Sequence, residues 1–179
     1  SHLNIMGGTH ATASREFLLP NAFNAKHTKM LKDAVNIPVF IGHNIFSPED
    51  AEKMLAEGNA DFVALGRSQL ADPAWAKKAK EGRASDIKPC INCLIGCIDR
   101  GMLSHTPIHC TVNPSLYRFE CKPVEKAETR KQVAVVGAGP AGCEAALTAS
   151  KRGHQVTIYE KRCIGGAMIE ASKPENKAN

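Results

Sequence analysis

The chain has 179 residues, of which 43% are hydrophobic and 23% charged, as is ordinary for a globular protein of one domain or two small ones. Its formal net charge is +5, but no basic run with interleaved aromatic side chains favours a nucleic-acid partner. No apolar stretch approaches the length of a membrane span, and no signal-peptide pattern is visible. The seven cysteines, four of them clustered, favour metal ligation in a reducing compartment over a secreted disulfide framework, so the cytoplasm is the expected location.

The first half of the chain alternates short apolar strands with helices. Strands are expected at residues 3–6, 37–41 and 60–65, and helices at 24–35, 48–57 and 73–82. The second of these helices has a clear start, because Ser47 is a good N-cap and Pro48 suits the first helical position. This alternation predicts an α/β fold with a parallel sheet or a (β/α) barrel.

Ligands in such folds bind at the carboxyl ends of the strands. Here those ends carry His10, the run Gly42-His43-Asn44, and Gly66-Arg67. Glycine next to a basic side chain suits a phosphate, because backbone N–H groups approach closely and Arg can make a bidentate contact. The residues alone leave a second interpretation open, in which the glycines only end their strands and Arg67 forms a structural ion pair. Likewise, a single histidine after two glycines is more often a loop residue than a catalyst.

Four cysteines then follow in the pattern C-x2-C-x3-C-x12-C: Cys90, Cys93, Cys97 and Cys110. Thiolates at such short spacings bind a soft metal or an iron–sulfur cluster. Zinc sites usually come as two C-x2-C pairs, whereas here three cysteines crowd one loop and the fourth arrives alone. The pattern therefore favours a [4Fe–4S] cluster, with Gly96 leaving room beside the metal. Zinc, and disulfides or free thiols, are the alternatives.

A polar stretch at 121–131 predicts a linker, and a nucleotide-binding pattern follows it. Strands are expected at 132–136 and 155–159 with a helix between them, and the loop before the helix is Gly137-Ala138-Gly139-Pro140-Ala141-Gly142. A G-x-G-x-x-G loop in this position, with Glu160 ending the next strand, is typical of a dinucleotide site. Its glycines make the turn, admit the pyrophosphate and pack helix on strand, while Glu160 would accept hydrogen bonds from the ribose.

A single βαβ unit leaves sheet edges and faces uncovered, so we expect the chain to be a fragment of a longer enzyme. The expected parts are residues 1–88, the C-terminal part of a barrel; 89–120, the cluster segment; 121–131, the linker; and 132–179, the start of a Rossmann-like domain.

The order of these parts resembles the iron–sulfur flavoenzymes related to Old Yellow Enzyme. That NADH:flavin oxidoreductase family includes 2,4-dienoyl-CoA reductase, 2-enoate reductase and trimethylamine dehydrogenase. The resemblance rests on Gly66-Arg67 through Ala71-Asp72-Pro73, on the four clustered cysteines, on Val112-Asn113-Pro114, and on residues 135–142.

The resemblance implies an FMN-binding TIM barrel, with the FMN phosphate at Gly42-His43-Asn44 and at Gly66-Arg67. It implies that the four cysteines hold a [4Fe–4S] cluster. It also implies that the glycine-rich loop, Glu160 and Gly165-Gly166 bind FAD or ADP. This chain departs from the family in lacking an arginine near Asn44. His10 falls where dienoyl reductases place a histidine that assists protonation of the substrate.

The function predicted on this basis is the NAD(P)H-driven reduction of an activated C=C bond in a small-molecule substrate. Electrons would enter as hydride at FAD and pass singly through the cluster to FMN. The cluster is expected between the flavins because one-electron and two-electron carriers must be bridged. One alternative is an amine dehydrogenase or demethylase of the same architecture, in which electrons run outward from the substrate. The other is a zinc-stapled nucleotide-binding module without redox function.

Overall fold

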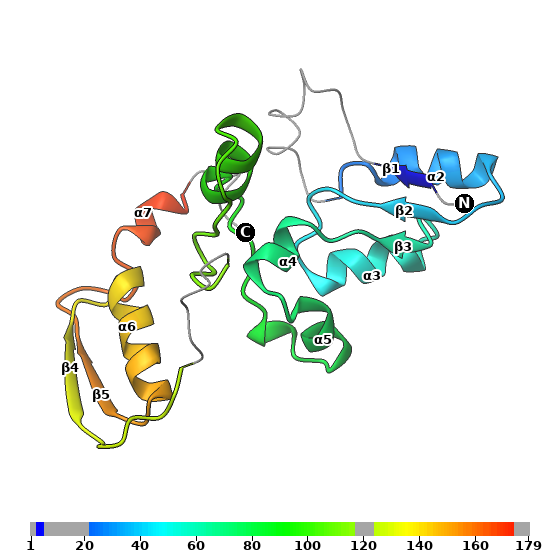
Figure 1. Cartoon of the computed structure of the whole chain (residues 1–179). Coiled ribbons are helices and arrows are strands. Elements are labelled where there is room, and N and C mark those ends of the chain that lie inside the picture. The colour runs from blue at the N-terminus through cyan, green and yellow to red at the C-terminus, as the bar shows by residue number, and fades with distance from the viewer. Residues whose placement is uncertain (1–2, 6–21, 117–123, 174–179) are drawn as a thin grey trace. The chain divides into compact units, whose positions relative to one another are not determined.

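The computed structural model describes residues 3–5, 22–116 and 124–173, and the chain divides into two compact units, residues 1–118 and 119–179 (Figure 1). His10 and Cys121 lie outside the described residues. The four clustered cysteines belong to the first unit, and the glycine-rich loop belongs to the second.

The first unit is built on a parallel sheet of three short strands in the order β1-β2-β3. These are β1 (Leu3–Ile5), β2 (Val39–Ile41) and β3 (Phe62–Val63), with Leu3 paired to Val39 and Phe40 to Phe62. Two helices lie between the strands in sequence, α2 (Ala25–Ala34) and α3 (Pro48–Ala56), and they pack on β2 and β3 respectively. This arrangement confirms the α/β class and brings the carboxyl ends of the strands to one edge.

Buried apolar side chains from the strand and helices form the core of the first unit. Ile41 on β2 is fully buried and clusters with Met54 from α3 and Trp75 from α5 (Trp75–Lys80). The Trp75 indole N–H donates to the carbonyl of Phe46 at 3.1 Å, so the ring is both buried and hydrogen-bonded. As the sequence predicts, Ser47 caps α3, its hydroxyl accepting from the Asp50 N–H at 3.0 Å.

Three further helical segments were not predicted. These are α4 (Arg67–Ala71), the short 3₁₀ turn η1 (Ala84–Asp86) and the π-helix η2 (Ile95–Leu103). The first two are too short to show an apolar period. In η2 the N–H of Asp99 bonds to the Leu94 carbonyl at 3.0 Å, and the N–H of Ser104 to the Asp99 carbonyl at 2.8 Å. Each of these bonds joins a residue to the one five positions earlier, which defines a π-helix. A π-helix does not follow the apolar repeat of an α-helix, so the sequence did not reveal it.

The second unit is a parallel strand–helix–strand unit. Strand β4 (Gln132–Val136) pairs with β5 (Gln155–Tyr159) in register from Gln132 with Gln155 to Val136 with Tyr159. Helix α6 (Pro140–Lys151) packs on both strands, and a short α7 (Met168–Ala171) follows. Strands β4 and β5 and helix α6 lie where the sequence predicts them, whereas α7 was not predicted. No helix in the described ranges is long and apolar enough to span a bilayer.

Candidate functional site

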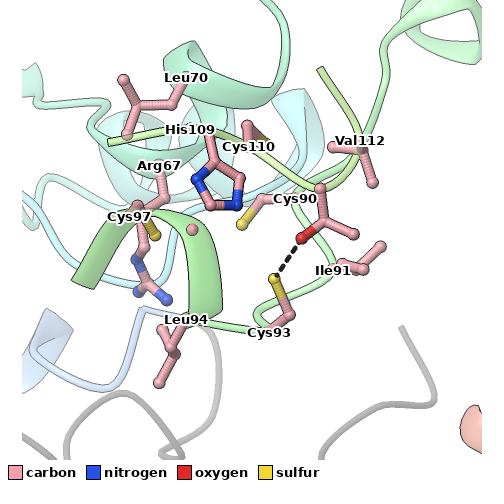
Figure 2. Close-up of a pocket in the computed structure, with 12 residues that line it drawn as sticks. Arg67, Leu70, Cys90, Ile91, Cys93, Leu94, Cys97, His109, Cys110 and Val112 are labelled. Carbon is pink, nitrogen blue, oxygen red and sulfur yellow. Dashed lines mark hydrogen bonds between the residues drawn. The ribbon is translucent and has the colours of Figure 1, made fainter. Parts of the chain in front are cut away.

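The four clustered cysteines line one pocket in the first unit (Figure 2). The other residues around it are Arg67, Leu70, Ile91, Leu94, Gly96, His109, Thr111 and Val112. All four are free cysteines, so their sulfurs are available as ligands. The C-x2-C-x3-C-x12-C spacing therefore does bring these thiols around one space.

Two glycines explain how Cys110 reaches a pocket whose other cysteines lie more than ten residues earlier. The His109 N–H donates to the Gly96 carbonyl at 2.8 Å, and a Cβ on Gly96 would lie only 2.4 Å from the His109 oxygen. A Cβ on Gly101 would lie 2.7 Å from Ile108 Cγ2. Gly96 therefore makes room for the returning backbone; it also lines the cysteine pocket, and its expected place beside a metal stays a prediction.

Strained backbone turns the segment between the first three cysteines. Asn92 and Leu94 flank Cys93 and have φ angles of 49° and 62°, in the left-handed region that L-residues rarely adopt. Such residues cost on the order of 1–3 kcal/mol each and concentrate at functional sites. The turn lets the thiols of Cys90, Cys93 and Cys97 line the same pocket.

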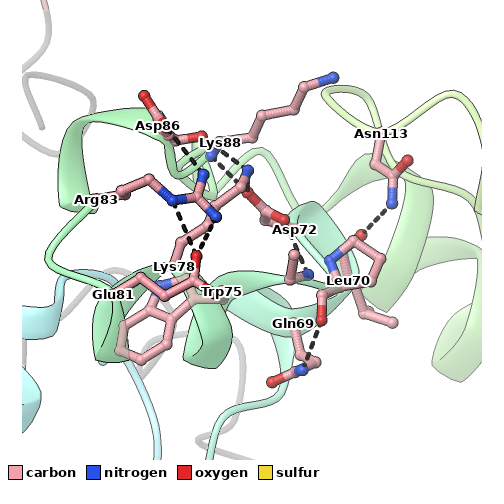
Figure 3. Close-up of polar contacts among 12 residues, drawn as sticks. Gln69, Leu70, Asp72, Trp75, Lys78, Glu81, Arg83, Asp86, Lys88 and Asn113 are labelled. Carbon is pink, nitrogen blue, oxygen red and sulfur yellow. Dashed lines mark hydrogen bonds and ion pairs between the residues drawn. The ribbon is translucent and has the colours of Figure 1, made fainter.

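Both ends of the cysteine segment are fastened to the end of α4 (Figure 3). At the start, the Lys88 N–H donates to Asp72 Oδ2 at 3.0 Å. At the end, the Asn113 side-chain amide donates to the Leu70 carbonyl at 2.8 Å. Leu70 and Asp72 are two residues apart, so the segment leaves and returns at one place. This gives a physical role to the Ala71-Asp72-Pro73 and Val112-Asn113-Pro114 motifs.

Asp72 is held ionised although it is only 4% exposed. Burial alone would raise the pKa of its carboxyl group. The Lys78 ammonium, 2.5 Å from Oδ2, and the N–H groups of Lys88 and Ala74 more than offset this, so that the pKa of Asp72 lies below its ordinary value. A buried carboxylate with several donors is a rigid anchor for the backbone that it binds.

Arg67 joins the strand ends to the cysteine segment. Its guanidinium donates to the side-chain oxygens of Asn44, which follows β2, and of Asn92, which lies between Cys90 and Cys93. The guanidinium also lies 5.2 Å from the centre of the Phe46 ring. Burial lowers the pKa of Arg67, and this outweighs the opposite effect of the nearby Cys90, Cys97 and Cys93 side chains. Arg67 is therefore a cation directed toward the cysteine pocket.

The pocket raises the pKa of two of the thiols. For Cys90 and Cys97 the main cause is burial, opposed by the N–H groups of Asn92 and Ile98 and by the charge of Arg67. A bound metal would displace those protons, because thiolates are the metal ligands. Thr111, which the sequence did not single out, has its hydroxyl 3.3 Å from the Cys93 sulfur.

A single metal ion and an iron–sulfur cluster require different arrangements of their thiolate ligands. Zinc needs all its ligand atoms about 2.0–2.3 Å from one point. Within the described residues, no three His, Cys, Asp or Glu side chains are gathered in that way. In a [4Fe–4S] cluster each cysteine binds a different iron, so the four sulfurs surround a volume instead of a point. Four thiols lining one pocket fit that requirement.

The predicted phosphate residues meet at the edge of the first sheet. The Ala64 N–H donates to the Ile41 carbonyl at 2.8 Å, which sets Gly42 beside the chain leading to Gly66 and Arg67. His43 and Asn44 have φ angles of 77° and 50°, so the backbone turns sharply after β2. The His43 ring packs edge-on against Phe23, with centroids 5.5 Å apart.

The glycines of the loop predicted to bind a nucleotide have different surroundings in the second unit. A Cβ on Gly142 would lie 1.9 Å from the Gly137 carbonyl, whereas one on Gly139 would meet no atom within 4 Å. The third glycine of the motif therefore packs helix against turn, and the second faces open space. Gly137 itself has a φ of 99°, which glycine adopts at no steric cost.

Glu160 lies at the predicted place but contacts the loop directly. Its carboxylate accepts from the Ala138 N–H at 2.8 Å and from the Arg162 N–H at 2.9 Å, and these bonds lower the pKa of Glu160. Gly165 also joins the loop, its N–H donating to the Ala138 carbonyl at 2.8 Å. A Cβ on Gly166 would lie 3.1 Å from Gly139 Cα. The residues predicted for the nucleotide thus lie together.

Two protein families match the two units. Residues 9–86 match the NADH:flavin oxidoreductase / NADH oxidase family, and residues 123–179 match the pyridine nucleotide-disulphide oxidoreductase family. The NADH oxidase of Thermoanaerobacter brockii is 51% identical over 150 residues, which are 83% of this chain and 23% of that protein. The chain spans about a quarter of the length of the curated relatives it matches.

Solved structures show the same likeness. The complex of 2-naphthoyl-CoA reductase with 2-naphthoyl-CoA superposes with a TM-score of 0.92 at 32% identity, covering 99% of this chain and 28% of that one. Histamine dehydrogenase from Rhizobium sp. 4-9 superposes with a TM-score of 0.87 at 28% identity, covering 99% and 26%.

Proposed function

The chain belongs to the NADH:flavin oxidoreductase / NADH oxidase family, and we propose that it is part of an enzyme that uses NAD(P)H to reduce an activated C=C bond in a small-molecule substrate. The observation that carries the proposal is the pocket lined by four cysteines and Arg67, because Arg67 also reaches the strand ends through Asn44. Such a pocket fits an iron–sulfur cluster adjoining a flavin site.

Each cofactor has a proposed set of residues. The cluster is held by Cys90, Cys93, Cys97 and Cys110; the FMN phosphate by Gly42, His43, Asn44, Gly66 and Arg67; and FAD or ADP by the loop 137–142 with Glu160, Gly165 and Gly166. When bound, the cluster would carry single electrons between flavins that exchange electron pairs with the nicotinamide and the substrate. The chain's own contribution is to fix these groups in place and to orient the proton donor.

The architecture follows the same proposal. The first unit is part of a TIM barrel, residues 1–88, with the cluster segment 89–120 attached at its carboxyl-terminal face. After the linker 121–131, the second unit begins a Rossmann-like domain. Support comes from the parallel strands with phosphate-type residues at their carboxyl ends and from the open space at Gly139. The cytoplasm is the proposed location, because it keeps ligand cysteines reduced.

His10 is the proposed proton donor to the reduced substrate. It lies outside the described residues, so the proposal rests on its position in the sequence after the first strand of this chain. A histidine suits the task because its ordinary pKa is close to neutral.

The reductase is proposed ahead of an amine dehydrogenase because the superposed 2-naphthoyl-CoA reductase is the closer of the two structures described above. The likeness to histamine dehydrogenase keeps amine oxidation as the second candidate. The two candidates differ in the direction of electron flow, which a pair of anaerobic half-reactions would reveal.

The test uses the full-length protein purified without oxygen. We expect about four irons per chain, with FMN and a second nucleotide. NAD(P)H should bleach the flavin, and an α,β-unsaturated acyl-CoA should restore its colour. Bleaching by an amine and not by NAD(P)H would favour the second candidate. Stoichiometric zinc without iron would contradict the cluster. Cys143→Ala and Cys163→Ser are controls that should keep the iron.

A further inference from the structure

Arg67 touches both the strand ends and the cysteine segment, and the proposed flavin contact uses only the first of these. Resting on the proposed function, we propose that Arg67 is also a positioning residue for the cluster and raises its reduction potential. Its positive charge, held in the four-cysteine pocket, would stabilise the more negative, reduced form of the cluster.

The geometry holds this charge in one orientation. The two terminal nitrogens of the guanidinium donate to different amide oxygens, those of Asn44 and Asn92, and the group lies 5.2 Å from the Phe46 ring centre. Asn44 and Asn92 are both buried, so the acceptors are themselves fixed. A planar guanidinium with a fork of acceptors and an aromatic neighbour is well ordered in a way that a lysine is not.

The same contacts connect Arg67 to the ligands. Figure 2 shows its guanidinium among the residues that line the pocket with Cys90, Cys93 and Cys97. Asn92, which accepts from Arg67, also directs its backbone N–H toward the Cys90 sulfur. Net charge and hydrogen bonds to sulfur are two of the factors that set the potential of an iron–sulfur cluster. In a partly buried pocket a charge acts more strongly than it would in water.

The experiment compares Arg67→Gln, which removes the charge, with Arg67→Lys, which keeps it. Arg83→Gln is the matched control, because Arg83 lies in the same unit but is exposed and paired with Glu81 and Asp86. Iron and FMN are counted first in each full-length variant. The cluster is then titrated anaerobically at fixed potentials, and its reduced form is followed by electron paramagnetic resonance.

We expect Arg67→Gln to shift the one-electron reduction equilibrium of the cluster at least about tenfold toward the oxidised form, which is a decrease of about 59 mV. Arg67→Lys should shift it less, and Arg83→Gln should match the wild type. A normal iron content with an unchanged potential in Arg67→Gln would overturn the inference, even if FMN binding weakened, because Arg67 would then serve the phosphate alone.

Loss of iron is also decisive. If Arg67→Gln loses the cluster while Arg67→Lys keeps it at a potential near that of the wild type, the charge is what matters and the inference stands. If both variants lose it, Arg67 is only a structural part of the loop and the inference fails. Wild-type protein that contains no iron would instead refute the proposed function.

Discussion

The His109 N–H donates to the Gly96 carbonyl at 2.8 Å, and this contact closes the cysteine segment on itself. Cys97 follows Gly96 and Cys110 follows His109, so one hydrogen bond brings two ligands to the pocket. Because a Cβ on Gly96 would lie 2.4 Å from the His109 oxygen, Gly96→Ala must push the backbone at residue 109 away from η2. We expect this variant to lose most of its iron.

The control is Gly139→Ala, in the second unit, where a Cβ would meet no atom within 4 Å. Iron per chain and the visible absorbance of the cluster give the comparison. Gly139→Ala should keep its iron. Full iron occupancy in Gly96→Ala would show that Cys110 reaches the pocket without this close approach.

The role of Asp72 as an anchor of the cysteine segment can be tested by a substitution of its own. In Asp72→Asn, the new NH₂ group would face the Lys88 N–H and the Lys78 ammonium in one orientation of the amide, and the Ala74 N–H in the other. All three groups are donors, so either orientation sets one donor against another. We expect the local opening of residues 72–92 to become easier by about 1.5–3 kcal/mol, the range for hydrogen bonds to charged groups. Hydrogen exchange measured by mass spectrometry on peptides from this region would report the change.

Asp86→Asn is the matched control for this change. Its carboxylate pairs with Arg83 at the surface, where ion pairs contribute little. Exchange in residues 72–92 should therefore stay close to the wild type in Asp86→Asn. If residues 72–92 were equally protected from hydrogen exchange in Asp72→Asn and Asp86→Asn, Asp72 would not anchor the cysteine segment.

The contribution of Asp72 should depend on pH in a defined direction. Because the folded structure lowers the pKa of Asp72, its carboxylate stabilises the fold fully above the unfolded pKa, about 3.9. The stabilisation is lost as the pH falls through the lower, folded pKa. The difference in exchange between wild type and Asp72→Asn should thus stay constant from pH 7 to about pH 5 and narrow below about pH 4. If this difference in exchange increased as the pH fell, the lowered pKa of Asp72 would be contradicted.

The second and third glycines of the nucleotide loop, Gly139 and Gly142, should respond differently to replacement by alanine. Gly142→Ala puts a Cβ 1.9 Å from the Gly137 carbonyl, so α6 cannot pack on the loop and the second unit should lose stability. Gly139→Ala meets only open space, so the fold should persist while the approach of a pyrophosphate is blocked. Circular dichroism and bound nucleotide content separate the two effects. A Gly139→Ala protein with a full complement of nucleotide would remove that glycine from the site.

The regular elements followed from the sequence because each has a local cause. Ser47 and Pro48 define the start of α3, and the run 132–136 followed by a glycine-rich loop defines β4 and α6. The gathering of four cysteines around one pocket also follows from their spacing.

The remaining features depend on contacts between distant residues. The pairing of Arg67 with Asn92 spans 25 positions, and that of Asn113 with Leu70 spans 43, so neither leaves a periodic signal. The π-helix at 95–103 contains Gly96 and Gly101, which are poor helix formers but allow the close approach of residues 108–109. Only the folded chain shows why those glycines are there.

The last prediction concerns His10. Reduction of a conjugated C=C bond requires a hydride at one carbon and a proton at the other, or on the carbonyl oxygen. Histidine can donate or polarise near neutral pH, and the loop after a barrel strand is where such a group would face the flavin. His10→Ala should therefore leave the bound FMN, the iron content and the reduction of flavin by NAD(P)H close to those of the wild type.

In His10→Ala, only the oxidative half-reaction, in which the substrate reoxidises the flavin, should become slower. Reoxidation by an unsaturated acyl-CoA should slow by roughly 10²–10⁴-fold, the usual contribution of a positioned proton donor. Stopped-flow absorbance follows both half-reactions in the same preparation, and His27→Ala in helix α2 is a control histidine that should change neither. Because loss of flavin would slow both steps, a defect confined to reoxidation identifies proton transfer. Reoxidation at the wild-type rate would return His10 to the role of an ordinary loop residue.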